Sequence, residues 1–314
     1  MPQPTYLQLS KPLMSNITAK IIADSVSSVS GQRLTTYELE YPRFIHSEFM
    51  THKVLSKNSA SSRAIPIAAM HKHIEDVPQY PSKWGKNNPG MQSKEEMNDL
   101  ERQSAIGVWD AARKQALSHS AILAQLGAHK QIANRLTEPF MQMKVIATGT
   151  EWANFFHLRD HPDADPTIHD LAIKMRIARD ESEPDELSPG EWPLPYIETT
   201  RYETGGELYY LINGKPVSLE VARKVSASCC AQVSYRKNDE SIEKAEMIFD
   251  KLINSVPVHA SPVEHQATPI DYTPRVLKEW PTGVTHMDRQ LNLWSANFRD
   301  WIQFRQLIPN HVKW

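Results

Sequence analysis

The most informative stretch of this chain is Thr51-His52-Lys53-Val54-Leu55-Ser56-Lys57-Asn58-Ser59-Ala60-Ser61-Ser62-Arg63. Seven residues separate a His-Lys pair from Ser61, and Arg63 stands two positions beyond it. Hydroxyl and guanidinium groups match phosphate oxygens, and a guanidinium can bind two of them at once. The stretch therefore predicts a site where a basic pair and a Ser-x-Arg triplet hold two anions. A solvated polar turn is the alternative interpretation, since Ser, Asn and Lys are common in loops.

The composition limits the classes of function. The 314 residues suffice for one large domain or two ordinary ones, and we expect a single domain over 1–314. The 35 Lys and Arg residues nearly balance the 37 Asp and Glu residues, so binding to long nucleic acid is not favoured. No apolar run is long enough for a bilayer. The two cysteines, Cys229 and Cys230, are adjacent and unsuited to a structural disulfide, which favours a cytoplasmic location.

Several segments predict regular structure. Residues 34–41 alternate between apolar and charged side chains, which predicts a half-buried strand that Pro42 ends, followed by a helix after Arg43. Residues 93–126 predict a long helix. Asp165-Pro166 is typical of an N-cap with Pro at the first helical position. These patterns favour an α+β fold in which long helices pack around a small antiparallel sheet.

The C-terminal half is less regular. Residues 181–217 form a predicted excursion with a hairpin turn at Asn213-Gly214. Ser218 and Asp239 are the expected N-caps of the two following helices. The aromatic and basic segment 280–314 is predicted to form a subunit interface or an active-site wall.

Two further N-terminal segments carry polar chemistry. The first is Trp152-Ala153-Asn154-Phe155-Phe156-His157-Leu158-Arg159, and the second is Lys130-Gln131-Ile132-Ala133-Asn134-Arg135, which precedes Pro139. An Arg beside a pyrimidine stabilises negative charge that develops on the ring when C5 becomes nucleophilic. Asn and Gln each offer a donor and an acceptor, so they can read a pyrimidine edge. A core helix and a polar helix surface are the structural alternatives.

Together these segments resemble the flavin-dependent thymidylate synthases. In that family Arg-His-Arg stands seven residues before Ser, with Arg two positions further on, and Thr51 and Lys53 replace the two arginines of the triplet here. Asn154 to Arg159 resembles the family's Asn-Phe-x-x-Leu-Arg segment. The 130–135 segment resembles Arg-Glu-x-Ala-Arg, with Gln131 and Asn134 at the acidic and basic positions.

Two C-terminal segments extend the resemblance. Ala231-Gln232-Val233-Ser234-Tyr235 is similar to the family's Ala-Arg-Val-Ser-Phe, and His259-Ala260-Ser261-Pro262-Val263-Glu264-His265 is similar to its His-Glu-Thr-Pro-Phe-Glu-His. In ordinary members both precede the Arg-His-Arg triplet, whereas here both follow it. The resemblance therefore implies a circularly permuted order, which close chain termini tolerate. It implies that Ser234, His259 and Ser261 lie near His52 and Asn154.

Permutation carries two further expectations. The 34–41 strand should share a sheet with a strand that follows His265. The additional segment 280–314 is free to wander away from the site.

The resemblance also implies ligands and residue roles. FAD, methylenetetrahydrofolate and NADPH would serve one-carbon transfer to C5 of a deoxypyrimidine monophosphate in a homotetramer with shared active sites. The implied catalytic residues are Arg159 and His259. The implied substrate-binding residues are Glu48, Ser61, Arg63, Gln131, Asn134 and Arg159. The implied cofactor-binding residues are His52, Lys53, Asn58, Asn154, Ser234, His259, Ser261 and Glu264.

The departures from the family pattern leave the product open. The substitutions at Thr51, Lys53, Ser59, Gln131 and Asn134 would shift the pocket beside the base or the flavin. Thymidylate formation from dUMP and hydroxymethylation of dUMP or dCMP are both compatible, and hydroxymethylation is typical of viruses, which would place the protein in a host cytoplasm.

Two other functions remain alternatives. One is a metal-dependent hydrolase using His157, His161 and the nearby aspartates, although the sequence predicts no metal site there. The other is a non-catalytic protein that binds a flavin or a nucleotide.

Overall fold

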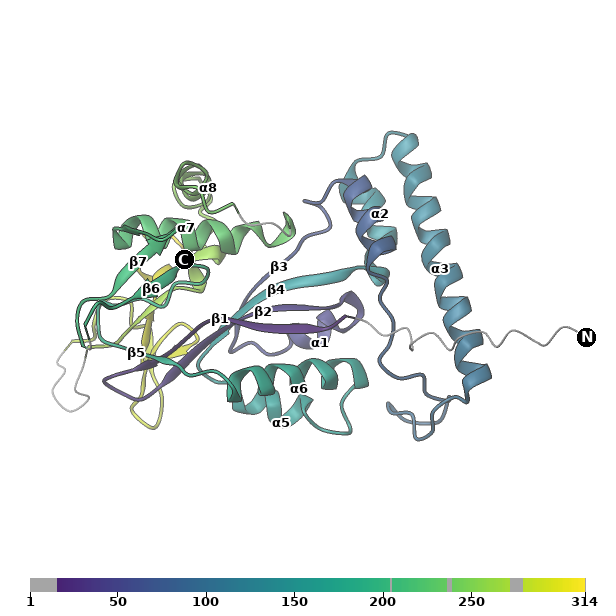
Figure 1. Ribbon diagram of the computed structural model, residues 1–314, viewed down its shortest axis with the longest axis horizontal. Helices are drawn as coiled ribbons and strands as arrows, with labels where there is room; N and C mark the ends of the chain where they lie inside the picture. The colour runs from purple at the N-terminus through teal and green to yellow at the C-terminus, as the bar shows by residue number, and fades with distance from the viewer. Residues whose placement is uncertain (1–15, 204, 236–238, 272–278, 314) are drawn as a thin grey trace, which may run out of the picture.

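The protein is described by a computed structural model that covers residues 16–203, 205–235, 239–271 and 279–313. A five-stranded sheet with the order β3-β4-β2-β1-β5 lies at its centre (Figure 1). Its strands are β1 (Thr18–Ser27), β2 (Arg33–Pro42), β3 (Ser56–Ser59), β4 (Gln142–Gly149) and β5 (Asp185–Leu187). All neighbouring strands are antiparallel except β5, which runs parallel to β1.

The predicted strand at 34–41 is confirmed as β2, and its alternation gives the sheet two different faces. Tyr37, Leu39 and Tyr41 lie opposite Ala147, Val145 and Met143 of β4. These side chains form the first, apolar face. Because side chains alternate along a strand, the second face carries the polar residues of the same strands. These are Thr36, Glu38, Ser56, Asn58, Lys144 and Thr148.

Helices cover the apolar face. They are the 3₁₀ helix η1 (Arg43–Ile45), α1 (His46–Met50), α5 (Ala153–Arg159) and α6 (Pro166–Asp180). The carboxylate of Asp165 accepts hydrogen bonds from the backbone N–H groups of Thr167 and Ile168, so the predicted N-cap is confirmed. Figure 1 shows α5 and α6 beneath the sheet, where Leu171 and Met175 of α6 are fully buried.

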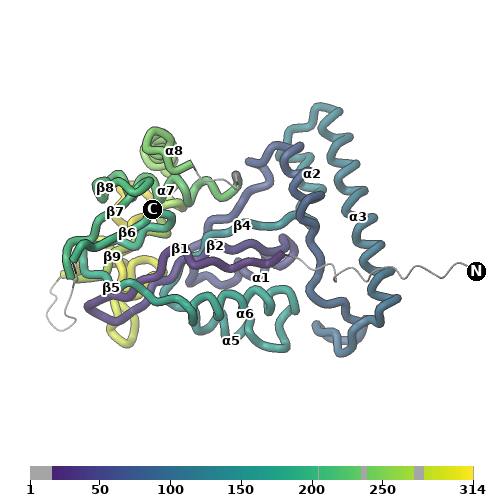
Figure 2. Tube along the Cα trace, in the orientation of Figure 1, coloured from purple at the N-terminus to yellow at the C-terminus, as the bar shows by residue number. Residues whose placement is uncertain are grey.

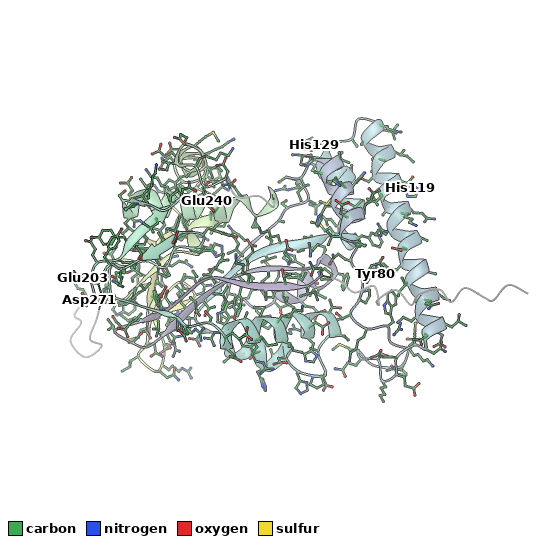
Figure 3. The ribbon with its side chains drawn as sticks, in the orientation of Figure 1. Tyr80, His119, His129, Glu203, Glu240 and Asp271 are labelled. Atoms are coloured by element: carbon green, nitrogen blue, oxygen red, sulfur yellow. The ribbon has the colours of Figure 1, made fainter. Side chains whose placement is uncertain are left out.

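A second helical group stands at the far end of the sheet. It consists of α2 (Ile67–Asp76), α3 (Asp99–Gln125), α4 (Lys130–Ala133) and η2 (Asn134–Phe140). The long helix α3 begins later than the predicted residue 93, because Asn98 and Glu101 form a capping box there. The preceding loop is tied to α3 by Tyr80, whose hydroxyl donates to Asp110 over 2.9 Å (Figure 3).

The C-terminal half covers the polar face. Its helices are α7 (Leu219–Ala231), η3 (Gln232–Tyr235), α8 (Ile242–Ile253) and η4 (Ser261–Glu264). Ser218 caps α7 as predicted. The prediction for Asp239 is wrong: Ser241 is the N-cap of α8, and Asp239 instead accepts a hydrogen bond from the Ser241 backbone N–H.

Small strands complete the fold (Figure 2). They are β6 (Glu198–Thr200), β7 (Tyr209–Ile212), β8 (Lys215–Val217), β9 (Ala267–Pro269), β10 (His286–Met287), β11 (Leu293–Ser295), β12 (Phe298–Arg299) and β13 (Trp301–Gln303), with η5 (Phe304–Leu307) after them. Asn213 and Gly214 both have positive φ between β7 and β8, which confirms the predicted hairpin. The architecture is therefore α+β.

One expectation about the sheets is wrong. The strand that follows His265 is β9, and it pairs with β13 rather than with the sheet that contains β2. Leu34 of β2 still packs with Ala267 and Trp301 in one apolar cluster, so the two sheets touch through side chains instead of sharing hydrogen bonds. Among the described helices, none has both the length and the apolar character needed to cross a membrane.

Candidate functional site

The opening stretch of the sequence is a strand with a loop at each end, and not a solvated turn. Residues 56–59 form β3, which pairs with β4 from Ser56 opposite Thr148 to Ser59 opposite Val145. His52 is buried ahead of the strand, and Lys53 is exposed. Ser61 and Arg63 follow at the other end, where the side chain of Arg63 is exposed. The two predicted anion-binding elements therefore lie at opposite ends of β3.

Arg159 joins two stretches that are 107 positions apart. Its Nε donates to Nε2 of His52 over 3.1 Å, and its Nη1 donates to a carboxylate oxygen of Glu48, also over 3.1 Å. The ring of Phe155 packs edge-on against the His52 imidazole with centroids 5.0 Å apart. The structure thus gathers three predicted site residues, Glu48, His52 and Arg159, into one group at the end of α5.

The charges in this group follow from burial. Burial, together with the charges of Arg159 and Lys57, lowers the pKa of His52 to about 4. His52 is therefore neutral at pH 7, and its Nε2 accepts the hydrogen bond that the N–H of Arg159 donates. Burial raises the pKa of Glu48 above its ordinary value, with Asp165 adding to the effect and Arg159 opposing it. Burial and Lys53 lower the pKa of Lys57 to about 8.

The segment 231–235 lies against the second end of β3. The hydroxyl oxygen of Ser234 accepts a hydrogen bond from the backbone N–H of Ser61 over 2.9 Å, across 173 positions of sequence. The side-chain amide of Asn58 donates to the carbonyl oxygen of Cys230 over 3.3 Å. The C-terminal segment therefore supports the loop that carries Ser61 and Arg63. Within the described ranges, no ion-pair partner is found for Arg63.

Asn134 also holds the loop that carries Ser61 and Arg63. Its side-chain amide donates to the carbonyl oxygens of Ser62 and Ile65 over 2.8 and 2.9 Å, and the residue is fully buried. Both donors of the amide are thus used inside the protein. The carbonyl oxygen of this side chain is buried and has no hydrogen-bond partner among the described residues. Gln131 is exposed on α4.

The second C-terminal segment meets the first end of β3. The backbone oxygen of Glu264 and the hydroxyl of Ser56 both accept hydrogen bonds from the side-chain amide of Gln303 over 3.1 Å. Asn297 donates to the carbonyl oxygen of Val54 over 3.2 Å. Permutation left the segment 280–314 free to wander away, but its described part is hydrogen-bonded to β3 and to Val54 just before it.

Three of the predicted residues remain apart from these contacts. Asn154 is exposed in the first turn of α5. His259 is exposed just before η4, and Ser261 is exposed as the first residue of η4. No hydrogen bond joins Asn154 to either of them in the described part of the chain. Their predicted roles stay predictions.

A cavity of about 630 Å³ opens where these segments meet. It is lined by Lys53, Leu55, Ser56, Glu264, Thr285, Ala296, Asn297, Gln303, Arg305, Gln306, His311 and Val312. Lys53 and Glu264 were predicted from their motifs. Asn297 and Gln303 were not, because no motif marks them. Arg305 was expected only as a member of the aromatic and basic segment 280–314, predicted to form an interface or an active-site wall.

His265 is buried behind this cavity on the polar face of the sheet. Its Nδ1 lies 2.9 Å from the hydroxyl of Thr148, which also bonds to Thr36 over 2.9 Å. Burial lowers the pKa of His265 to about 3. Its Nε2 has no partner within the described ranges. A neutral imidazole therefore links the segment 259–265 to β4.

The metal-hydrolase alternative finds no gathered ligands. His157 and His161 are exposed, and Asp160 pairs with His169 and Arg176 at 3.4 and 2.5 Å. In the described part of the chain no group of three or more His, Cys, Asp or Glu side chains is placed to hold a metal ion. Cys229 and Cys230 are buried free thiols, and burial raises the pKa of both.

Comparison with solved structures gives likenesses of low sequence identity. A UMP/dUMP methylase PolB from Streptomyces cacaoi bound with 5-Br UMP aligns with a TM-score of 0.45 and 19% identity, over 52% of this chain and 89% of that chain. A structure of the methylase with 5-Br dUMP aligns with a TM-score of 0.43 and 18% identity, over 52% and 90%. No family model matches the chain, and no curated protein matches its sequence. Likeness at this level assigns neither a family nor an activity.

Proposed function

We propose that this protein transfers a one-carbon unit from methylenetetrahydrofolate to C5 of a deoxypyrimidine monophosphate, with FAD as cofactor and NADPH as reductant. The observation that carries the proposal is the convergence of four distant motif segments on β3. Arg159 meets His52 at one end, and Ser234 meets Ser61 at the other. Convergence of this kind is what a shared site requires and what unrelated surface motifs lack.

The proposal includes a circularly permuted order of the motifs. The segments 231–235 and 259–265 follow the Thr51–Arg63 stretch in sequence, yet they pack against the two ends of its strand. A homotetramer with active sites shared between subunits would add further contacts to exposed residues such as Asn154 and His259.

In this proposal, Ser61 and Arg63 hold the nucleotide phosphate, since Arg63 is exposed and can offer its full guanidinium. Arg159 polarises the base and stabilises negative charge that develops on it. Glu48 and the neutral His52 orient Arg159 through two hydrogen bonds of 3.1 Å. Both amide N–H groups of Asn134 donate to the loop that carries Ser61 and Arg63, so we assign Asn134 the role of positioning that loop.

The residues around the cavity fit a flavin dinucleotide. A volume of about 630 Å³ lies within the usual range for ligand sites, and its lining combines Lys53 with hydroxyl and amide groups. Lys53 and Glu264 would contact the cofactor directly. The cofactor roles of His52, Asn58, Asn154, Ser234, His259 and Ser261 rest on the family resemblance alone, because these residues do not line the cavity. When bound, FAD supplies the redox chemistry, while the protein binds and orients it.

The deciding experiment is product analysis by mass. Purified protein is incubated with dUMP or dCMP, methylenetetrahydrofolate, FAD and NADPH. A mass gain corresponding to a methyl group indicates thymidylate-type synthesis. A mass gain corresponding to a hydroxymethyl group indicates that water, and not hydride, adds to the methylene group at C5. Bound flavin without any product would favour the non-catalytic alternative, and absence of both would contradict the proposal.

The phosphate assignment is tested separately. Arg63→Ala should weaken nucleotide binding by about 1.5–3 kcal/mol, because a charge-assisted contact to phosphate is lost, and it should leave FAD binding nearly unchanged. Arg289→Ala removes one exposed arginine outside the cavity and serves as the control. Unchanged nucleotide affinity in folded Arg63→Ala protein would place the phosphate elsewhere.

A further inference from the structure

The cavity beside β3 has an unequal distribution of charge. The stretch 51–63 contributes Lys53 to the lining of the cavity, and the segment 280–314 contributes Arg305 and His311. Among the described residues that line the cavity, Glu264 is the only acidic one. Two fixed positive charges therefore face one negative charge, and His311 adds a further positive charge when protonated.

Arg305 is held in place by the protein itself. Its Nη1 donates to the carboxylate of Glu264, and its Nη2 donates to the carbonyl oxygen of His311 over 3.3 Å. These two contacts use two of the five N–H donors of a guanidinium. The side chain remains 30% exposed, compared with 18% for Glu264. Arg305 is thus anchored on one side and open to the cavity on another.

The backbone that carries Arg305 is also fixed. Gln303, two residues earlier, is buried in β13 and bonds to Ser56, Asn297 and the Glu264 carbonyl. Little conformational freedom is left to lose when a ligand binds, which favours affinity. The hydrogen bonds between residues 295–305 and β3 therefore hold this side of the cavity in a fixed conformation before a ligand binds.

We propose that Arg305 and Lys53 form an anion-binding pair that takes a phosphate-bearing ligand into this cavity. A guanidinium fork matches two phosphate oxygens, and the ammonium of Lys53, which lines the same cavity, adds a point charge. Glu264 competes with the ligand for Arg305 in the free protein. The identity of the ligand, a flavin dinucleotide or the nucleoside monophosphate, rests on the proposed function, whereas the anion site itself does not.

The test uses inorganic pyrophosphate, FAD and riboflavin as probes, with binding measured by calorimetry on the full chain. Arg305→Met should weaken pyrophosphate and FAD binding roughly tenfold to a hundredfold and leave riboflavin, which lacks phosphate, unchanged. Lys53→Met should weaken the same two ligands less. Glu264→Gln should act in the opposite sense and tighten pyrophosphate binding, because the competing carboxylate is gone. Arg289→Met is the matched loss of one exposed arginine and should change nothing.

Competition distinguishes the two sources of phosphate. Displacement of pyrophosphate by FAD assigns the site to the flavin dinucleotide, and displacement by dUMP assigns it to the nucleotide. If Arg305→Met fails to fold, Arg305→Lys keeps the charge without the fork and should show an intermediate loss. Equal weakening of riboflavin and FAD, or unchanged pyrophosphate binding in folded Arg305→Met protein, would overturn the inference. Tight pyrophosphate binding in a protein that binds no flavin would contradict the proposed function and leave this inference standing.

Discussion

The two faces of the five-stranded sheet are built from the same strands but hold the protein together in different ways. On the apolar face Tyr37, Leu39 and Val145 pack against α1, α5 and α6. On the polar face Glu38, Thr148 and Ser56 are joined to the C-terminal half by hydrogen bonds, and their partners are Tyr196, His265 and Gln303. The apolar face can pack against different apolar side chains, because the hydrophobic effect does not depend on the direction of a contact. The second face depends on specific donors and acceptors.

This difference explains where the candidate site lies. Polar groups on the second face have to be paired when they are buried, and unpaired ones are costly. Segments that cover this face therefore supply matching side chains, as Gln303 does for Ser56 and Ser234 does for the loop at Ser61. The same groups can bind a polar ligand wherever the cover leaves a cavity.

The largest effect is expected on the apolar face. Leu171 of α6 is fully buried against the sheet, so Leu171→Ala should lower the free energy of unfolding by about 4 kcal/mol through lost burial and a residual cavity. Urea denaturation followed by circular dichroism measures the change. Leu158→Ala, at a position on α5 that is 48% exposed, is the control and should change the stability little. Equal effects of the two substitutions would show that the apolar face does not dominate stability.

A somewhat smaller effect is expected from the ion pair on the polar face. Lys144 Nζ lies 2.9 Å from a carboxylate oxygen of Glu38, and the same carboxylate accepts a hydrogen bond from the hydroxyl of Tyr196. Lys144→Met should cost about 3 kcal/mol, because Glu38 then stays charged without its partner. Adding Glu38→Gln should recover part of the loss in the same denaturation assay.

The control for the ion pair is Lys224→Met. Lys224 pairs with an exposed Glu220 one helical turn away, so its loss should have little effect. A double variant no more stable than Lys144→Met alone would show that the cost arises from packing and not from the unpaired charge.

Acid should weaken the fold through its buried histidines. Burial lowers the pKa values of His46 and His52 to about 4 and that of His265 to about 3, whereas an unfolded histidine titrates near 6.5. The unfolded chain then binds more protons, so stability is full above pH 6.5 and falls as the pH decreases toward 4. His265→Gln should flatten this slope by about 1.4 kcal/mol per pH unit.

Unfolding free energies measured at a series of pH values between 7 and 4 test this slope. The control is His119→Gln, because His119 is exposed on α3 (Figure 3). An unchanged slope in His265→Gln protein would mean that His265 is not a source of the acid sensitivity.

The smallest effect concerns one hydrogen bond between the two halves of the chain. Ser234→Ala removes the acceptor of the Ser61 backbone N–H, which should cost about 1 kcal/mol locally. Hydrogen exchange at the Ser61 amide should then accelerate about fivefold, while Ser104→Ala on the distant α3 should leave it unchanged. No acceleration would indicate that other contacts, such as the hydrogen bonds of Asn134 and Lys130, hold the loop without Ser234.

Local patterns in the sequence predicted the elements but not their partners. The alternation at 34–41, the cap at Asp165 and the Asn213-Gly214 turn each depend on residues a few positions apart, and all three predictions are confirmed. The sequence at Asp239 contains several adjacent polar residues that can cap, so the pattern there indicated a helix start without deciding which residue takes the cap.

The motifs in the sequence by themselves predicted which side chains carry chemistry, from the basic pair at His52 to the Glu264 segment. Only the tertiary structure decided which of them meet. It paired β9 with β13 instead of with the sheet of β2, placed Arg159 on His52, and brought Arg305 to Glu264. The last two contacts join residues 107 and 41 positions apart, so they depend on how distant polar groups find partners in the folded chain, which no local pattern encodes.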